Sequence, residues 1–408
     1  MNTSRRHTLR LLAVGSALPS IWISPTVFAQ GTGPIRIGLL VPLTGAAAAY
    51  GPEMAKAGRV AAELINKEAG GILGGRKIEV LIEDSESSAT AGVAAARKLL
   101  DIDKVSILAG VWNSSVAMAL KPIALERKMG LLVSGSADAI TDGDNKGLVW
   151  RFQSRGQDWG GVIARAMLRS KMRRVSILGL QNPFTVGMIE PFISEIRKGG
   201  GEVVDRVFYN PGQPSYRSEV EQVFSKKIDG VFMPALLPDF TAIAKDVYRG
   251  GFDAKIFTLS IAADSEGKFI ENVGAQVAEG ITHLQPTPPV GSLGYKRFIK
   301  LMGETDDRVF LFACNTYDQI AMIAMAIEKA KSTTSSEFLA QFPAISNGPG
   351  EAVFNPVDGL KAIRAGKAIN YSGAGSSVEF NSRGDLVNRE FTQYKIVGGK
   401  NTTVGVIS

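Results

Sequence analysis

Two adjacent serines stand where the chain is expected to turn from a strand into a helix. An apolar run over residues 105–109 ends at Gly110, and a helical pattern begins at Ser114 or Ser115. The first amides of a helix are unpaired and carry the positive end of its dipole, so serine hydroxyls beside them form a site for an anion such as a carboxylate. In an open α/β sheet, ligands bind at such turns. The alternative is that Ser114 is an ordinary N-cap worth about 1 kcal/mol.

Other reactive side chains are few. Cys314 is the single cysteine and stands in the apolar run 309–314, which favours a buried hydrophobic role over a nucleophile. The two histidines are His7 and His283, so a histidine-rich metal site is excluded and a Ser-His-Asp mechanism would rest on His283 alone. We therefore predict no metal and no cofactor.

The first residues have the features of an export signal. Arg5 and Arg6 precede an apolar segment over 11–23, and Ala29 follows it as the small residue that a signal peptidase prefers. The paired arginines are typical of a twin-arginine signal, with Thr8 where phenylalanine is more common. We expect cleavage after Ala29 and a periplasmic protein. Later residues contain no apolar run of about eighteen, so we expect it to be soluble and not anchored.

The length and the net charge of the chain indicate its number of lobes and the kind of partner it binds. Of 408 residues, about 380 remain after cleavage, too many for one small core, so two lobes are expected. Loss of the three arginines of the signal lowers the formal charge from +7 to +4, and the remaining basic residues are interspersed with acids. Nothing in this pattern indicates a nucleic-acid partner.

Strands and helices alternate from residue 35 onward, and the alternation occurs twice. The first series has strands at 35–41, 77–82, 105–110 and 130–133 and helices at 51–68 and 90–100, followed by a helix interrupted at Pro122. After 150–153 the second has helices at 156–169, 186–198, 218–224 and 240–249 and strands at 174–178, 202–208, 230–233 and 255–259. The chain crosses again near 280–286, and a helix at 310–331 and a final strand at 391–397 complete it. Such alternation predicts an α/β fold with two doubly wound parallel sheets, each covered on both faces.

A series of short motifs resembles the solute-binding proteins of branched-chain amino-acid ABC transporters. The likeness covers essentially the whole mature chain. The motifs are Ile37-Gly-Leu-Leu-Val-Pro-Leu-Thr-Gly45, Ala49-Tyr-Gly51, Glu63-Leu-Ile-Asn66, Gly70-Gly-Ile-Leu-Gly-Gly-Arg-Lys77, Glu83-Asp84, Ala94-Ala-Ala-Arg-Lys-Leu99, Gly251-Phe252, Ala278-Glu-Gly280, Tyr317-Asp318, and Ile369-Asn-Tyr-Ser-Gly-Ala-Gly375 ahead of Glu379-Phe380.

The resemblance implies a two-lobed protein that binds a solute. It implies two α/β lobes joined by three hinge strands, closure on a small polar ligand, delivery to an ABC permease in the inner membrane, and no chemistry on the ligand. We expect a monomer. The expected division is 1–29 for the signal peptide, 30–152 with 287–376 for the first lobe, and 153–286 with 377–408 for the second lobe.

The resemblance also implies ligand-binding residues in the first lobe. The serine pair of the family binds the ligand α-carboxylate and matches Ser114 and Ser115. The next strand end adds hydroxyl and backbone groups. An aromatic residue at the cleft rim matches Tyr50, for which a surface turn is the alternative. Trp112 replaces a smaller residue of the family and is either a pocket wall or core packing. The residues of the next strand end are Ser134, Ser136 and Ala137.

The second lobe departs further from the family pattern. Phe184 keeps an aromatic ring where a tyrosine is usual, and Asp264 is the nearest candidate to pair with an α-ammonium group. If Asp264 faces solvent, the ligand has no ammonium group. These changes favour a carboxylated ligand with a sizeable apolar or aromatic body, either an aromatic acid or a large hydrophobic amino acid.

Two other functions are compatible with parts of the pattern. An α/β enzyme is one, but Pro42-Leu-Thr-Gly45 follows the first strand in place of Gly-x-Gly-x-x-Gly, and no phosphate-binding or nucleophile-elbow motif occurs. We therefore predict that the chain is not an enzyme. The other is a ligand sensor that docks on a membrane receptor, whose ligand chemistry would be the same as for transport.

Overall fold

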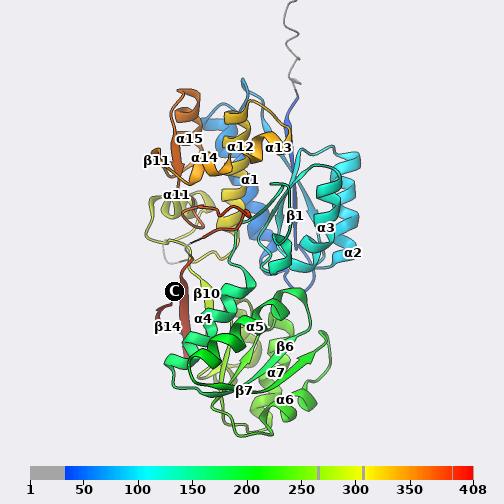
Figure 1. Ribbon diagram of the computed structural model, residues 1–408, viewed down its shortest axis with the longest axis vertical. Coiled ribbons are helices and arrows are strands. Elements are labelled where there is room, and N and C mark those ends of the chain that lie inside the picture. The colour runs from blue at the N-terminus through cyan, green and yellow to red at the C-terminus, as the bar shows by residue number, and fades with distance from the viewer. Residues whose placement is uncertain (1–32, 264–266, 306–307, 388, 408) are drawn as a thin grey trace, which may run out of the picture. The chain divides into compact units, whose positions relative to one another are not determined.

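The computed structural model describes residues 33–263, 267–305, 308–387 and 389–407, in two lobes that are each built on a β-sheet (Figure 1). The strands are β1 Ile35–Val41, β2 Ile78–Asp84, β3 Ile107–Val111, β4 Gly130–Val133, β5 Val149–Arg151, β6 Arg174–Leu180, β7 Glu202–Tyr209, β8 Gly230–Met233, β9 Lys255–Leu259, β10 Thr282–Pro286, β11 Glu351–Val353, β12 Ile369–Tyr371, β13 Phe391–Val397 and β14 Lys400–Ile407. The predicted signal peptide lies outside the described residues.

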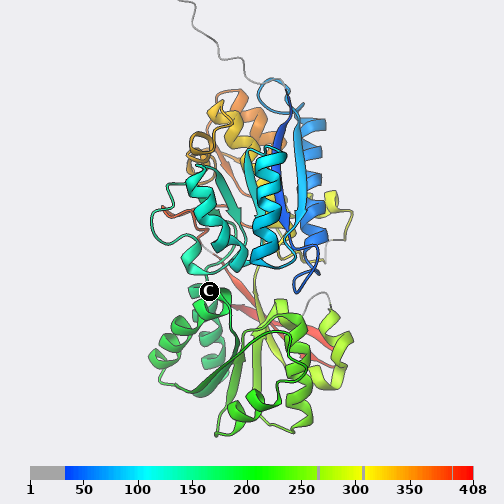
Figure 2. The same cartoon turned by 90° about the vertical axis from the view of Figure 1, so that its right-hand side faces the viewer.

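Helices pack against both sheets (Figures 1 and 2). They are α1 Gly51–Glu68, α2 Ala89–Arg97, α3 Ser114–Glu126, α4 Gly156–Arg169, α5 Pro183–Lys198, α6 Arg217–Phe224, α7 Leu237–Arg249, α8 Ser260–Ala263, α9 Lys268–Val273, α10 Ala275–Ala278, α11 Leu293–Met302, α12 Ala313–Ala330, α13 Ser335–Leu339, α14 Phe342–Ser346 and α15 Pro356–Arg364; a π-turn, Lys98–Ile102, and a 3₁₀ turn, Asp138–Ile140, complete the list. No helix among the described residues is long and apolar enough to span a membrane.

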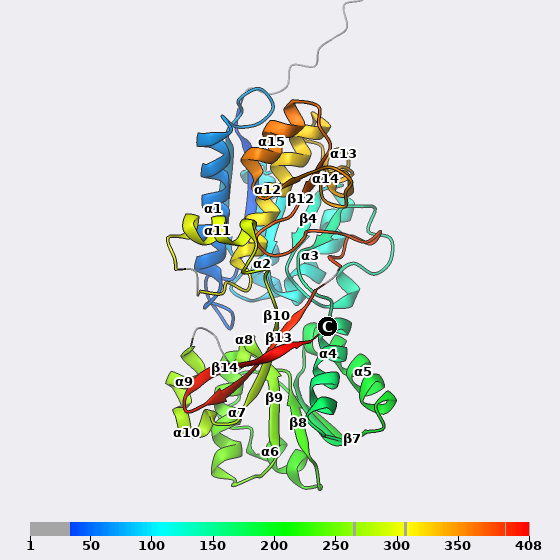
Figure 3. The same cartoon turned by 90° about the vertical axis from the view of Figure 1, so that its left-hand side faces the viewer.

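Both sheets have the same strand order. The first lobe has the parallel order β2-β1-β3-β4-β5. In the second lobe the parallel strands run β7-β6-β8-β9-β10, with β13 and β14 added antiparallel at the β10 edge (Figure 3). The strand order reverses between β1 and β3 in the first lobe and between β6 and β8 in the second lobe. Open α/β sheets bind ligands at such switch points. The predicted fold of two doubly wound lobes is confirmed.

The first sheet is buried on both faces because successive residues of its strands point to opposite sides. Ile37 and Leu39 of β1 join one apolar core with α1 and α12, whereas Leu40 joins a second core with α2 and α3. This burial explains why the sequences of β1, β3 and β4 are almost continuously apolar, whereas the edge strand β2 is only partly buried and contains three acidic residues.

Two element predictions were wrong. Helix α3 runs through Pro122 without a break, so the missing amide of the proline is tolerated within its last turn and a half. Strand β13 is not the final strand, because β14 pairs with it through a turn at Gly398 and Gly399. Both glycines have positive φ, as a two-residue hairpin turn requires.

The lobes are joined by three crossings, after β5, after β10 and ahead of β13. We expected the chain to enter the second lobe at residue 377. However, Phe380 packs edge-on against Trp150 of the first lobe, and Leu386 donates its amide to the carbonyl of Arg151. These contacts place Phe380 and Leu386 against β5 of the first lobe, and all the expected lobe boundaries stay predictions.

A buried ion pair fastens this third segment beside the first crossing. Arg151 and Asp385 have side chains that are 0% and 1% exposed, and Arg151 Nε donates to Asp385 Oδ1 at 2.8 Å. The other guanidinium nitrogens donate to the carbonyl of Gly135 and the hydroxyl of Thr141. Both charges are therefore paired, as burial in a low dielectric requires, although Asp385 Oδ2 has no hydrogen bond among the described residues and lies 3.8 Å from Arg155 and from Arg383.

Replacing Asp385 with alanine should lower the free energy of unfolding by about 3–5 kcal/mol, because Arg151 would be left as a buried charge without its carboxylate. Urea unfolding of the chain from residue 30 onward measures this. The matched control is Glu221→Ala in the exposed Arg217–Glu221 pair, which should cost less than about 1 kcal/mol. Equal effects of the two variants would contradict the role given to the buried pair.

His283 on β10 lies in a second buried polar contact. Its imidazole is 0% exposed, with Nδ1 2.7 Å from Ser260 Oγ and Nε2 2.9 Å from Asn401 Oδ1. Burial lowers the pKa of His283 to about 4. The contact joins the β9–α8 turn to β10 and β14. Ser260 is itself buried and lies outside the residues that line the pocket described below, so nothing in its position indicates a nucleophile.

We expect the contribution of His283 to the free energy of unfolding to fall as the pH falls from about 6.5 to about 4, while the raised pKa of buried Asp318 acts in the opposite direction. In this interval the unfolded chain protonates His283 and the folded chain does not, so up to about 3 kcal/mol present above pH 6.5 is lost. In an untagged protein from residue 30 onward, His283 is the single histidine, and its NMR signal should titrate near pH 4. A midpoint near 6.5 would contradict its burial.

Candidate ligand-binding pocket

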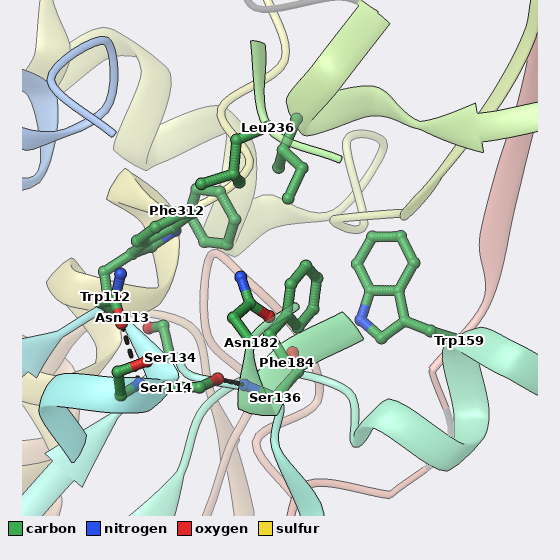
Figure 4. A pocket seen from close by; sticks show the side chains of 12 residues that line it. Trp112, Asn113, Ser114, Ser134, Ser136, Trp159, Asn182, Phe184, Leu236 and Phe312 are labelled. Carbon is green, nitrogen blue, oxygen red and sulfur yellow. Dashed lines mark hydrogen bonds between the residues drawn. The ribbon is translucent and has the colours of Figure 1, made fainter. Parts of the chain in front are cut away.

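One pocket is lined by residues of both lobes (Figure 4). It contains about 450 Å³ of space that no protein atom fills, part of it open to solvent. From the first lobe come Trp112, Asn113, Ser114, Ser115, Ser134, Ser136 and Phe312, and from the second lobe come Trp159, Asn182, Phe184, Leu236 and Ile261.

The two switch points explain why these residues meet. Trp112 and Ser114 follow β3, Asn182 follows β6 and Leu236 follows β8, each at the carboxyl end of its strand. Because parallel strands end at the same sheet edge, each lobe presents its strand–helix turns to the pocket.

Ser114 lies inside helix α3 and is not its N-cap. Asn113 is the N-cap and accepts the amide of Ser115 at 2.8 Å. The Ser114 hydroxyl oxygen instead accepts the amides of Ser136 and Ala137, each at 3.1 Å. The interpretation of Ser114 as an ordinary N-cap is therefore wrong. A hydroxyl that accepts from two amides still has its own proton to donate to a ligand.

The neighbouring serines are positioned by different contacts. The hydroxyl of Ser115 has no hydrogen-bond partner among the described residues, and Ser134 Oγ accepts from Gln319 Nε2 at 3.4 Å. Gln319 Oε1 also accepts the amide of Gly110 at 2.7 Å. Gly110 has φ of +73°, and a Cβ there would lie 2.4 Å from Leu39. Glycine is therefore required for the β3 irregularity that leads into Trp112.

Two aromatic rings of the first lobe, Trp112 and Phe312, line the pocket, and Tyr50 packs against both. Trp112 stacks on Tyr50 with ring centroids 5.9 Å apart, and Phe312 contacts both rings edge-on at 5.1 and 5.4 Å. Tyr50 supports this wall from behind, because it is not among the lining residues. Trp112 belongs to the core and is also a lining residue, so its predicted role as a wall for the ligand stays a prediction.

The second-lobe wall is also aromatic and apolar. Phe184 stands at the start of α5, where Asn182 caps the helix by accepting the amide of Thr185 at 2.9 Å. Trp159 of α4 contacts Phe184 edge-to-face, with centroids 6.2 Å apart. Leu236 and Ile261 complete this side.

The structure brings together six of the nine predicted site residues in the lining: Trp112, Ser114, Ser115, Ser134, Ser136 and Phe184. Ala137 is buried beside them with its amide on Ser114, and Tyr50 lies behind Trp112. Asp264 lies outside the described residues. The ligand-binding roles of all nine stay predictions.

Six lining residues were not predicted: Asn113, Trp159, Asn182, Leu236, Ile261 and Phe312. The two asparagines have a signal in the sequence, because each is an N-cap residue between an apolar strand and a helix. No local sequence pattern marks Trp159 or Phe312 as a pocket residue, since only the packing of distant segments brings them to the pocket.

Comparisons with known proteins agree with this fold. The family profile described as periplasmic binding protein matches residues 34–368. The chain belongs to this family. A Leu/Ile/Val-binding protein, BraC3, of Rhizobium johnstonii is 26% identical to this periplasmic binding protein over 90% of its chain and 92% of the relative.

Solved structures of this periplasmic binding protein's relatives share its fold. A leucine binding protein, LivK, from Thermotoga maritima has a TM-score of 0.77 and 21% identity, covering 92% of this chain and 99% of that one. A solute binding protein of an ABC transporter from R. palustris, solved in complex with benzoate, has a TM-score of 0.71 and 20% identity, covering 92% and 96%.

Uncharged side chains and helix starts surround the pocket of this periplasmic binding protein, as far as the described residues show. None of the twelve lining residues is charged. Helices α3, α5 and α7 all begin at it, with the N-cap residues Asn113, Asn182 and Leu236 in the lining. Their positive dipole ends therefore converge on the ligand space.

Replacing Ser114 with alanine should lower the free energy of unfolding by about 1–3 kcal/mol, because the amides of Ser136 and Ala137 lose their acceptor. Ser115→Ala is the matched control and should change stability by less than about 0.5 kcal/mol. Thermal and urea unfolding of both variants without ligand would separate them. No difference between the two variants would show that the amides find another partner.

Proposed function

We propose that this protein captures a small carboxylate with an aromatic or large apolar body and delivers it to an ABC permease in the inner membrane. The observation that carries this proposal is the convergence of three helix N-termini on a pocket whose described lining is aromatic, apolar and hydroxylic, without a charged group. In this proposal the protein is a periplasmic monomer, exported by its signal peptide and cleaved after Ala29.

The carboxylate would bind at the start of α3. There Ser114 and Ser115 line the pocket, and no described residue accepts the amides of Ser114 and Val116. The helix dipole stabilises a negative charge at this point without a paired cation. The apolar body would lie between the wall of Trp112 and Phe312 and the wall of Phe184 and Trp159 (Figure 4).

Binding would then close the two lobes on the ligand. Because lining residues come from both lobes, a ligand that touches both walls stabilises the closed arrangement. The permease would recognise that arrangement, so docking depends on occupancy. Small-angle scattering should show compaction on saturation with ligand.

An amine-free acid fits the described lining better than an amino acid. An ammonium group would meet three positive helix ends and no acidic lining residue among those described. An amino acid would need Asp264, the predicted ammonium partner. The two alternatives therefore differ in one testable contact.

A thermal-shift screen of residues 30–408 should show stabilisation by benzoate and phenylacetate, and Asp264→Ala should leave the shift unchanged. At a hundred times its dissociation constant, a ligand adds about 2.7 kcal/mol, which is a shift of a few degrees. Leucine, phenylalanine and benzamide complete the screen. If only amino acids shift the transition and Asp264→Ala abolishes the shift, the ligand carries an ammonium group and the amine-free assignment is wrong.

A further inference from the structure

Two buried indole N–H groups line the pocket without a hydrogen-bond partner. Trp112 and Trp159 are 8% and 1% exposed, and neither Nε1 atom has a partner among the described residues. An indole nitrogen can only donate. Because a buried donor left unpaired is costly and rare, such a group in a ligand pocket points to an acceptor that the ligand supplies.

The two indoles stand on opposite walls. Figure 4 shows Trp112 beside Asn113 and the serines, and Trp159 across the pocket beyond Phe184. A ligand whose carboxylate binds at the start of α3 therefore extends its other end towards Trp159. Trp112 is next to the carboxylate end, and Trp159 is at the far end.

No protein group near Trp159 serves as its acceptor. Its ring packs edge-on against the rings of Phe184 and Phe391, with ring centroids 6.2 and 5.1 Å apart. The nearby Asn182 side-chain oxygen already accepts the amide of Thr185. The face of Phe184 offers at most a weak N–H to ring contact.

We propose that Trp159 is a specificity residue that recognises a neutral acceptor oxygen at the end of the ligand opposite its carboxylate. This inference rests on the proposed function and deepens it: the ligand is an aromatic monocarboxylate with a far hydroxyl, ether or carbonyl group. The proposal is limited to a neutral oxygen, because a single indole N–H supplies one hydrogen bond and cannot by itself stabilise a buried anion.

The test compares 4-hydroxybenzoate with 4-methylbenzoate, which have nearly the same shape and differ in the acceptor. Isothermal titration of residues 30–408 should show that 4-hydroxybenzoate binds about threefold to tenfold tighter, the range for one neutral hydrogen bond. Trp159→Phe should abolish this preference. The variant should bind 4-hydroxybenzoate more weakly and 4-methylbenzoate with unchanged affinity. Trp112→Phe makes the same chemical change on the opposite wall and should keep the preference.

A second variant separates the lost donor from altered packing. Trp159→3-benzothienylalanine keeps the two-ring shape and replaces N–H by sulfur, so it too should abolish the preference. If both variants keep the preference, or if Trp112→Phe removes it, the assignment to Trp159 is overturned. If neither benzoate derivative binds the unaltered protein, the proposed function itself fails for aromatic acids, which is a different result.

Discussion

The buried contact of Arg151 with Asp385 is the constraint on which the arrangement of the pocket depends. Through its other guanidinium nitrogens, Arg151 holds the carbonyl of Gly135 and the hydroxyl of Thr141. Residues 135–142 are thereby fixed beside the first crossing. Arg155, four residues further on, donates to Asp138 at 2.9 Å from the start of α4. The same short segment is therefore held by the first lobe at one side and by a helix of the second lobe at the other.

The peptide groups of Ser136 join the two halves of the ligand site. Its amide donates to Ser114 Oγ at 3.1 Å, and its carbonyl accepts the amide of Gly156, the first residue of α4, at 2.6 Å. One turn further along α4 stands Trp159. The Ser114 hydroxyl is thus connected to α4, the helix that carries Trp159, through two hydrogen bonds. A ligand that binds this hydroxyl acts at one end of that connection. If binding closes the lobes as proposed, it acts through this short connection, which consists of the Ser114 hydroxyl and the peptide groups of Ser136 and Gly156.

The fold could be predicted because it depends on local periodicity, whereas half of the pocket depends on distant packing. Strands such as 35–41 and helices such as 51–68 follow directly from the apolar pattern. Ser114 was predicted as a site residue from its position after a strand, but its acceptor role required residues 136 and 137 in place. Phe312 and Trp159 meet the serines only after both sheets form and the chain crosses between lobes. Strand β14 was missed although Gly398 and Gly399 signal its turn.

The absence of a cation from the described lining has a consequence for selectivity. A carboxylate bound to helix ends and hydroxyls is stabilised by dipoles that are fixed in the fold, so no side-chain charge must be desolvated on binding. The dipole ends repel an ammonium group as strongly as they attract an anion. An amine-bearing ligand is therefore accepted only if an acidic side chain offsets that repulsion. In the proposed complex, aromatic walls on both sides favour a flat or bulky apolar body, and the indole of Trp159 favours an acceptor oxygen at its far end.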